Sequence, residues 1–112
     1  MGLKTIASRR ITVPPNATAV ESIYTVPPGR TLHLKRVVVH FPVGTLSELH
    51  IKIFNGWIGI APTDGFLMGD DVKYEIDVDE KYGSQSVVRG MFINTSTVSQ
   101  RECIVTLLGE LE

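Results

Sequence analysis

The chain has 112 residues, enough for one domain (residues 1–112) with a core that needs no disulfide. Its 11 basic and 12 acidic side chains leave a formal net charge of -1, so the bulk charge predicts neither nucleic acid nor an anionic membrane as a partner. The one cysteine, Cys103, excludes an internal disulfide and a cysteine-rich zinc site. The first residues lack the apolar core of a signal peptide, and we expect synthesis in a reducing cytoplasm.

Short period-two patterns recur along the chain, and no segment has the apolar spacing of a long helix. Turns rich in proline, glycine and aspartate separate these patterns at intervals of roughly a dozen residues, which is typical of an antiparallel sandwich or barrel. We therefore predict an all-β antiparallel sandwich, most simply an eight-stranded jelly roll. The predicted strands cover residues 4–13, 19–26, 31–41, 47–54, 57–62, 72–79, 85–94 and 102–111.

Residues 1–13 allow two interpretations. They form the first strand of the sandwich, or they form an extended arm whose residues 4–12 pair with the sheet edge of a neighbouring subunit. Arg9 and Arg10 make this segment basic, so it could meet acidic groups of another subunit. We include both arginines in the predicted interface.

The predicted strand over residues 31–41 changes phase along its length. Leu32 and Leu34 share one parity, whereas the apolar residues after position 36 share the other. One extra residue in a strand produces such a shift, so we predict a β-bulge at Lys35-Arg36. The alternative is a strand that is buried on both faces in its second half.

One interpretation of the stretch FPVGTLS, residues 41–47, is a hairpin between the two strands that flank it. That hairpin would place His40 and His50 opposite each other. Two imidazoles are fewer ligands than zinc requires, and no carboxylate is placed beside them. We therefore expect ordinary surface histidines.

The segment NGWIGIAPTDGFLMG, residues 55–69, combines large apolar side chains with four glycines. Glycine permits tight turns, so these side chains either cap the core or face another subunit. Phe66, Leu67 and Met68 cannot all point inward from an extended chain, which favours self-association. Besides the two arginines, the predicted interface residues are Trp57, Ile58, Ile60, Phe66, Leu67 and Met68.

Acidic residues follow this segment. Asp70-Asp71 predicts a turn, with calcium binding by the two carboxylates as the alternative. In the next strand, residues 72–79, apolar residues alternate with charged ones, which predicts one buried and one wet face. The last strand, residues 102–111, places Cys103 on its buried face, and its other face is not wholly wet because it carries Ile104 and Leu108.

No combination of residues points to catalysis. The chain lacks a G-x-S-x-G nucleophile motif, and a cysteine beside leucines packs as a small hydrophobic residue. We expect no catalytic residue, no cofactor and no bound metal, and a small metal-dependent enzyme is the least favoured interpretation. Trp57 and Tyr82 could stack on a sugar ring, so a carbohydrate- or ligand-binding module is the alternative function.

Three stretches resemble a known class of proteins: VVVHFPVG, LHIKIFNGWIGIAPTDGFLMGDDVKYEIDVDE and INTSTVSQRECIVTLLGEL. Over about residues 26–111 they resemble small all-β virion proteins of tailed phages and related prophages, which include capsid decoration (cement) proteins and head or tail accessories. The shared features are the turns at residues 40–44, 62–66 and 69–71. The resemblance implies a non-enzymatic virion protein, made in the host cytoplasm, that forms homo-oligomers, with trimers favoured. It also implies binding to the major capsid protein or another virion protein.

Overall fold

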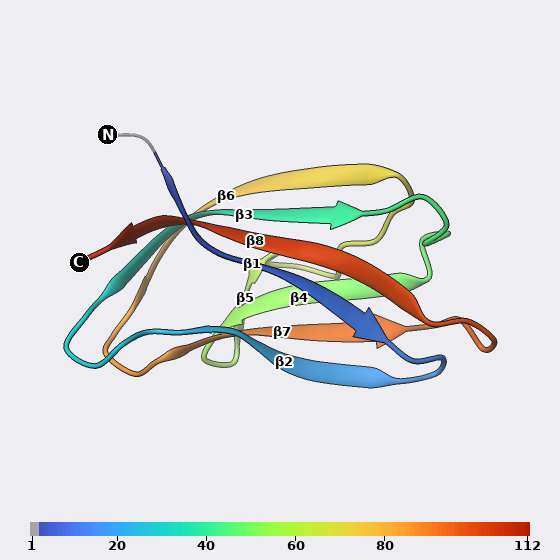
Figure 1. The fold of residues 1–112 in the computed structure, drawn as a ribbon, viewed down its shortest axis with the longest axis horizontal. Coiled ribbons are helices and arrows are strands. Elements are labelled where there is room, and N and C mark those ends of the chain that lie inside the picture. Colours follow the sequence, from blue (N-terminus) through green and yellow to red (C-terminus); the bar gives the residue numbers. More distant parts are fainter. Residues whose placement is uncertain (1–2) are drawn as a thin grey trace.

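A computed structural model describes residues 3–112 as two antiparallel β-sheets packed face to face (Figure 1). No helix in this part of the chain is long and apolar enough to cross a membrane. Residues 1 and 2, the start of the predicted arm, lie outside the described residues. The strands are β1 (Lys4–Val13), β2 (Thr18–Thr25), β3 (Leu32–Phe41), β4 (Leu49–Asn55), β5 (Ile58–Ala61), β6 (Val72–Tyr82), β7 (Val87–Asn94) and β8 (Arg101–Leu111).

The strand order is that of an eight-stranded jelly roll. Sheet A has the order β1-β8-β3-β6, and sheet B has the order β2-β7-β4-β5. The first strand pairs with the last, the second with the seventh, the third with the sixth and the fourth with the fifth, as in a long antiparallel ribbon rolled on itself. The predicted fold is therefore confirmed. Residues 4–13 pair along β8 within the same chain, so the arm interpretation of these residues is wrong.

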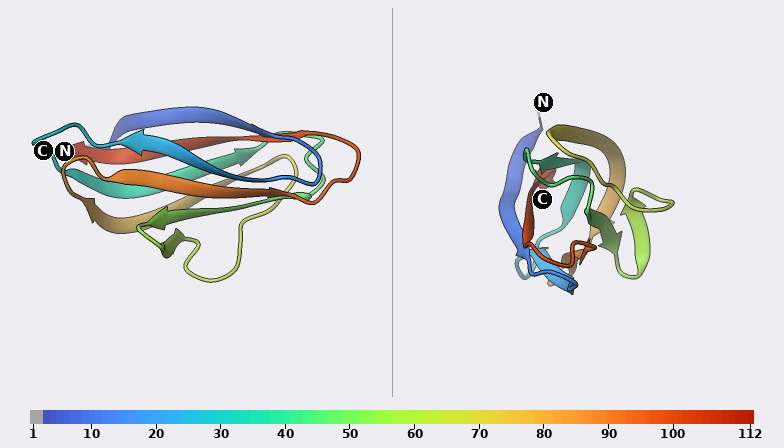
Figure 2. Two further views of the ribbon diagram at one scale, coloured as in Figure 1. Left: turned by 90° about the horizontal axis from the view of Figure 1, so that it is seen from below. Right: turned by 90° about the vertical axis from the view of Figure 1, so that its right-hand side faces the viewer.

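The core lies between the sheets and is built from the inward positions of the alternating strands (Figure 2). In β4, for example, Leu49, Ile51 and Ile53 are fully buried, and the residues between them face outward. Cys103 is also fully buried, as predicted, and burial raises the pKa of its thiol to about 12. Because the neutral thiol is neither exposed nor nucleophilic there, its role is packing.

The phase change in β3 is a β-bulge, as predicted. The pairing of β3 shifts register between Leu34 and Arg36 against both neighbours, β6 and β8. The extra residue turns Leu34 and Val37 to the same side, and both are fully buried. Gly109 of β8 pairs with Leu34 beside this bulge, where a Cβ atom would lie 2.2 Å from the carbonyl oxygen of His33. The bulge thus requires a residue without a side chain on the adjacent strand.

We predict that Gly109→Ala lowers the free energy of unfolding by about 2–3 kcal/mol, because the added methyl group forces backbone apart in the centre of sheet A. Equilibrium denaturant unfolding measures the change. Gly83→Ala is the matched control, since the nearest atom to its added Cβ would be at 3.9 Å. Equal stability of the two variants would contradict this account of the bulge.

The connection after β3 crosses between the sheets and is not a hairpin. β3 belongs to sheet A and β4 to sheet B. His40 pairs with Lys73 and Ile104, whereas His50 pairs with Ile93, so the two histidines face outward from opposite sheets. The hairpin that would have placed the two histidines opposite each other is therefore wrong. A turn of this length can close a hairpin or lead to another sheet, and here it leads to another sheet.

A buried asparagine joins the loops at one end of the sandwich. The Asn94 amide donates hydrogen bonds to the carbonyl oxygens of Val13, Pro14 and Ser99, at 3.0, 3.1 and 3.0 Å. Its side-chain oxygen accepts a hydrogen bond from the Ser96 N–H at 2.9 Å. The sequence predicts a turn here, but it does not indicate that one side chain connects the end of β1 with the loop between β7 and β8.

Replacing Asn94 by alanine removes the donor to one buried and two partly buried carbonyl groups, so we expect a loss of about 2–3 kcal/mol in the free energy of unfolding. Thermal and denaturant unfolding would measure it. Thr97→Ala, an exposed change in the same loop, should leave the stability unchanged within about 0.5 kcal/mol. A similar loss for both variants would show that the loop, and not the amide, is responsible.

Candidate interaction surface

The outer face of sheet A carries several ion pairs within the chain, beside outward apolar residues such as Val38 and Ile104. Arg36 donates to Asp77 at 2.8 Å, and Lys35 lies 3.4 Å from Asp79. Three more pairs on the same face are His33 with Asp79, Lys73 with Glu75 and Arg10 with Glu102. Exposed ion pairs of this kind contribute little to the stability of one chain.

The outer face of sheet B has a different composition. The outward positions of β4 and β7 hold no acidic residue; they are His50, Lys52, Phe54, Val87, Arg89, Met91 and Ile93. Val20 of β2 lies beside Met91 and is 55% exposed. This face therefore combines apolar side chains with cations.

Two aromatic rings from the segment after β4 lie against these cations. The Arg89 guanidinium is 5.5 Å from the centre of the Trp57 ring, and the Lys52 ammonium is 5.5 Å from the centre of the Phe66 ring. Each contact contributes about 0.5–1 kcal/mol at an exposed site. Among residues 3–112, neither cation forms an ion pair. We call Lys52, Phe54, Trp57, Phe66, Arg89 and Met91 the sheet B face.

The local backbone explains which apolar residues of this segment are exposed. Leu67 exchanges two backbone hydrogen bonds with Ile51, at 2.9 and 2.8 Å, on the edge of β4 that β5 leaves free. Leu67 consequently packs against the core, and its neighbours Phe66 and Met68 turn outward. The connection from β5 to β6 projects from the side of the sandwich (yellow-green in Figure 2).

The six apolar residues predicted at the interface thus divide into two groups. Trp57 and Ile58 are 80% and 74% exposed, and Phe66 and Met68 are more than one-third exposed. Ile60, by contrast, is buried in the core. A side chain buried within one subunit adds nothing to a contact with another, so Ile60 is not part of the candidate surface.

The two predicted interface arginines lie elsewhere on the molecule. Arg9 donates a hydrogen bond to the Ser22 carbonyl oxygen and so links the margins of the two sheets. Arg10 lies 3.4 Å from Glu102 on the outer face of sheet A. The structure does not bring either of them to the sheet B face.

Tyr82 is also absent from this surface. Its side chain is buried, its hydroxyl donates to the Phe54 carbonyl oxygen at 3.0 Å, and burial raises its pKa. The predicted sugar platform of Trp57 and Tyr82 is therefore wrong. The predicted strand ends at residue 79, whereas β6 continues to Tyr82, which shares the inward parity of Val72 and Tyr74.

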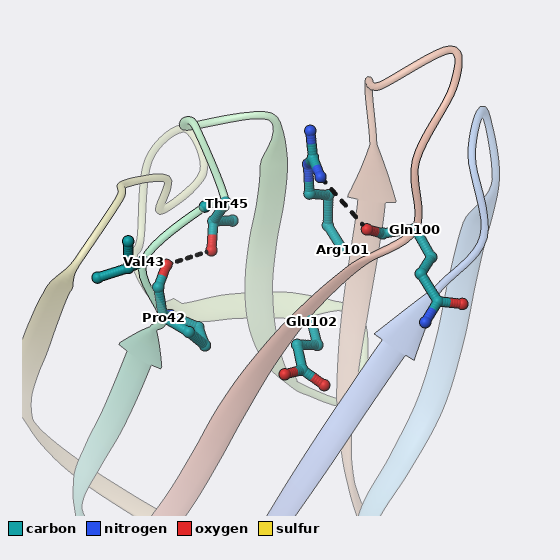
Figure 3. A pocket seen from close by; sticks show the side chains of 7 residues that line it. Pro42, Val43, Thr45, Gln100, Arg101 and Glu102 are labelled. Atoms are coloured by element: carbon teal, nitrogen blue, oxygen red, sulfur yellow. Dashed lines mark hydrogen bonds between the residues drawn. The ribbon is translucent and has the colours of Figure 1, made fainter.

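A shallow hollow of about 270 Å³ lies at the loop end of the sandwich (Figure 3). Its walls are residues 42–45 and 100–102. Its polar groups are used within the chain: the Thr45 hydroxyl donates to the Pro42 carbonyl oxygen at 2.7 Å, and Arg101 donates to Glu48 at 2.7 Å. Residues 3–112 contain no group of three or more potential metal-ligating side chains.

Asp70 stabilises the loop beside this hollow. Its carboxylate accepts hydrogen bonds from the N–H groups of Leu46 and Gly44, at 3.2 and 2.7 Å, and these bonds lower the pKa of Asp70 below its ordinary value of 3.8. The bonds hold Leu46 and Ser47, whose φ angles are 55° and 56°, in the left-handed region. The chain also bends at Asp70 and Asp71 before β6, as predicted, whereas the bonds from Asp70 to the distant loop are not evident from the sequence.

We predict that Asp70→Asn destabilises the protein at neutral pH and that the difference from the wild type disappears in acid. A lowered folded-state pKa contributes stability above the ordinary pKa, and this contribution is lost as the pH falls through the folded-state value, below 3.8. Denaturant unfolding at a series of pH values measures this difference. Asp71→Asn is the neighbouring control, and a pH-independent difference for Asp70→Asn would contradict the assignment.

Comparisons with known proteins give only distant likenesses. No family model matches the chain, and no curated protein sequence matches it. Among solved structures, PirA is 21% identical, with 93% of this chain and 95% of that chain covered and a TM-score of 0.44. FLHE is 10% identical, with 97% and 96% covered and a TM-score of 0.49. A Bacillus endospore appendage is 8% identical, with 97% and 92% covered and a TM-score of 0.40. The likeness to these chains is weak, and no argument below depends on it.

Proposed function

We propose that this protein is a non-enzymatic virion structural protein that assembles with copies of itself through the sheet B face and docks on a viral shell. It would be made in the host cytoplasm and act in the virion, as a capsid decoration or accessory protein bound to the major capsid protein or another virion protein. The observation that carries the self-assembly is the exposure of Trp57, Phe66 and Met68 beside cations without carboxylate partners. The virion class is supported by the sequence resemblance.

The energetic argument concerns apolar surface that one subunit leaves in water. Full burial of a large apolar side chain contributes about 1.5–3 kcal/mol. Trp57 and Ile58 remain mostly exposed, and Phe66 and Met68 remain partly exposed, so a partner that covers all four gains several such contributions. Scattered apolar residues need no explanation, but four within residues 57–68 favour an interface.

The oligomer that we propose is a trimer, as the resemblance favours. A closed trimer requires two different surfaces on each subunit, because a surface that pairs with itself produces only a dimer. The two outer faces of this sandwich differ in composition, which is compatible with such an arrangement.

A carbohydrate- or ligand-binding module remains the alternative function. The observation in its favour is the ring of Trp57, which is 80% exposed and held by Arg89. Since Tyr82 is buried, Phe66 is the other exposed ring on this face. The two functions differ in oligomeric state, because a binding module has no need to self-associate.

Sedimentation and light scattering of the wild type at micromolar concentration test the proposal. We expect an oligomer, and we expect Trp57→Ser combined with Phe66→Ser to give folded monomers, because the change removes the largest apolar contacts of the sheet B face. Val98→Ser is the matched control: Val98 is 83% exposed in the loop between β7 and β8 and should leave the mass unchanged.

A monomeric wild type would contradict the proposal. Glycan binding by such a monomer, lost in Trp57→Ser and retained in Val98→Ser, would establish the alternative function instead.

A further inference from the structure

The charges on the sheet B face argue against its pairing with the same face of another copy. Such a symmetric contact would bring Lys52 and Arg89 of both subunits together in a partly desolvated space. The outward positions of β4 and β7 hold no carboxylate to neutralise them. Unpaired cations that lose water, with like charges nearby, are costly. The sheet B face is therefore complementary in charge to a surface that carries carboxylates.

On the same chain, the outer row of β6 offers such a surface. Glu75, Asp77 and Asp79 occupy successive outward positions of this strand. The side chains of Asp77 and Asp79 are 78% and 79% exposed, whereas their partners Arg36 and Lys35 are each 37% exposed and lie closer to the sheet. β6 is an edge strand of sheet A, with a neighbour in that sheet on one side only (Figure 1).

The two cations of the sheet B face are spaced like two of the carboxylates on β6. Lys52 pairs with Met91, two residues from Arg89, so the cations stand in diagonal positions with Cβ atoms about 7–8 Å apart. Asp77 and Asp79 are two residues apart on one face of a strand, a separation of about 7 Å. Two cations and two carboxylates can therefore meet in one contact.

We infer that the sheet B face of one copy binds the outer row of β6 on the next copy, with Lys52 and Arg89 opposite Asp77 and Asp79. This inference rests on the proposed self-assembly and specifies its geometry. The contact joins two different surfaces, so it repeats from copy to copy and forms a ring where the rotation closes. Trp57 and Phe66, which lie against the two cations, exclude water from the rim and strengthen the charge pairs.

Charge reversal on each surface tests the inference. The first variant carries Lys52→Glu and Arg89→Glu; the second carries Asp77→Lys and Asp79→Lys. We expect each variant alone to be monomeric at concentrations where the wild type is assembled, with association weakened at least about tenfold. We expect a chain that carries all four reversals to assemble again, because each reversed surface then meets a reversed surface of opposite sign on the next copy. Lys4→Glu on β1 is the control for reversal at a lysine outside both surfaces and should assemble like the wild type.

The results separate the inference from the proposed function. If the second variant assembles like the wild type while Trp57→Ser with Phe66→Ser is monomeric, self-assembly stands and the β6 contact is wrong. A monomeric wild type overturns both. Circular dichroism verifies that each variant is folded. If the lysine pair on β6 unfolds the chain, Asp77→Asn with Asp79→Asn gives the decision: a weaker oligomer supports the contact, and unchanged assembly overturns it.

Discussion

The inward row of strand β3 is the constraint on which the rest of the sandwich depends. This strand pairs with β8 on one side and with β6 on the other, so an error in its phase would turn apolar residues outward through the middle of sheet A. The bulge between Leu34 and Arg36 restores the phase, and both halves of the strand then pack against sheet B. Gly109 makes the bulge possible, because its missing side chain leaves room for the backbone of His33. A local irregularity thus maintains a continuous core.

Once the inward rows have formed the core, the outward rows are free to differ. Those of sheet A carry several ion pairs within the chain. Those of β4 and β7 hold apolar residues and cations, and the segment after β4 adds exposed aromatic rings. The same jelly roll could carry any of several functions, because function depends on such surfaces and not on the fold. The difference between the two faces is the physical basis of the proposed assembly.

The loops are held by a few polar side chains with several bonds each. Asn94 connects the end of β1 with the loop between β7 and β8, and Asp70 holds the crossover between the sheets. Both groups satisfy backbone atoms that no strand pairs, which limits the motion of the loops around them. The segment that carries Trp57 and Phe66 therefore extends from a frame whose ends are fixed.

The sequence by itself determined the alternation of each strand, the β-bulge at Lys35-Arg36, the core position of Cys103 and the turn at Asp70. Each of these follows from side-chain period or turn chemistry within a few consecutive residues. Only the tertiary structure decided that β3 and β4 lie in different sheets, that Ile60 is buried while Ile58 is exposed, and that Asn94 joins distant loops. The physical reason is that parity tells which side of a strand a residue occupies, whereas burial depends on which strands and loops, far away in the chain, cover that side.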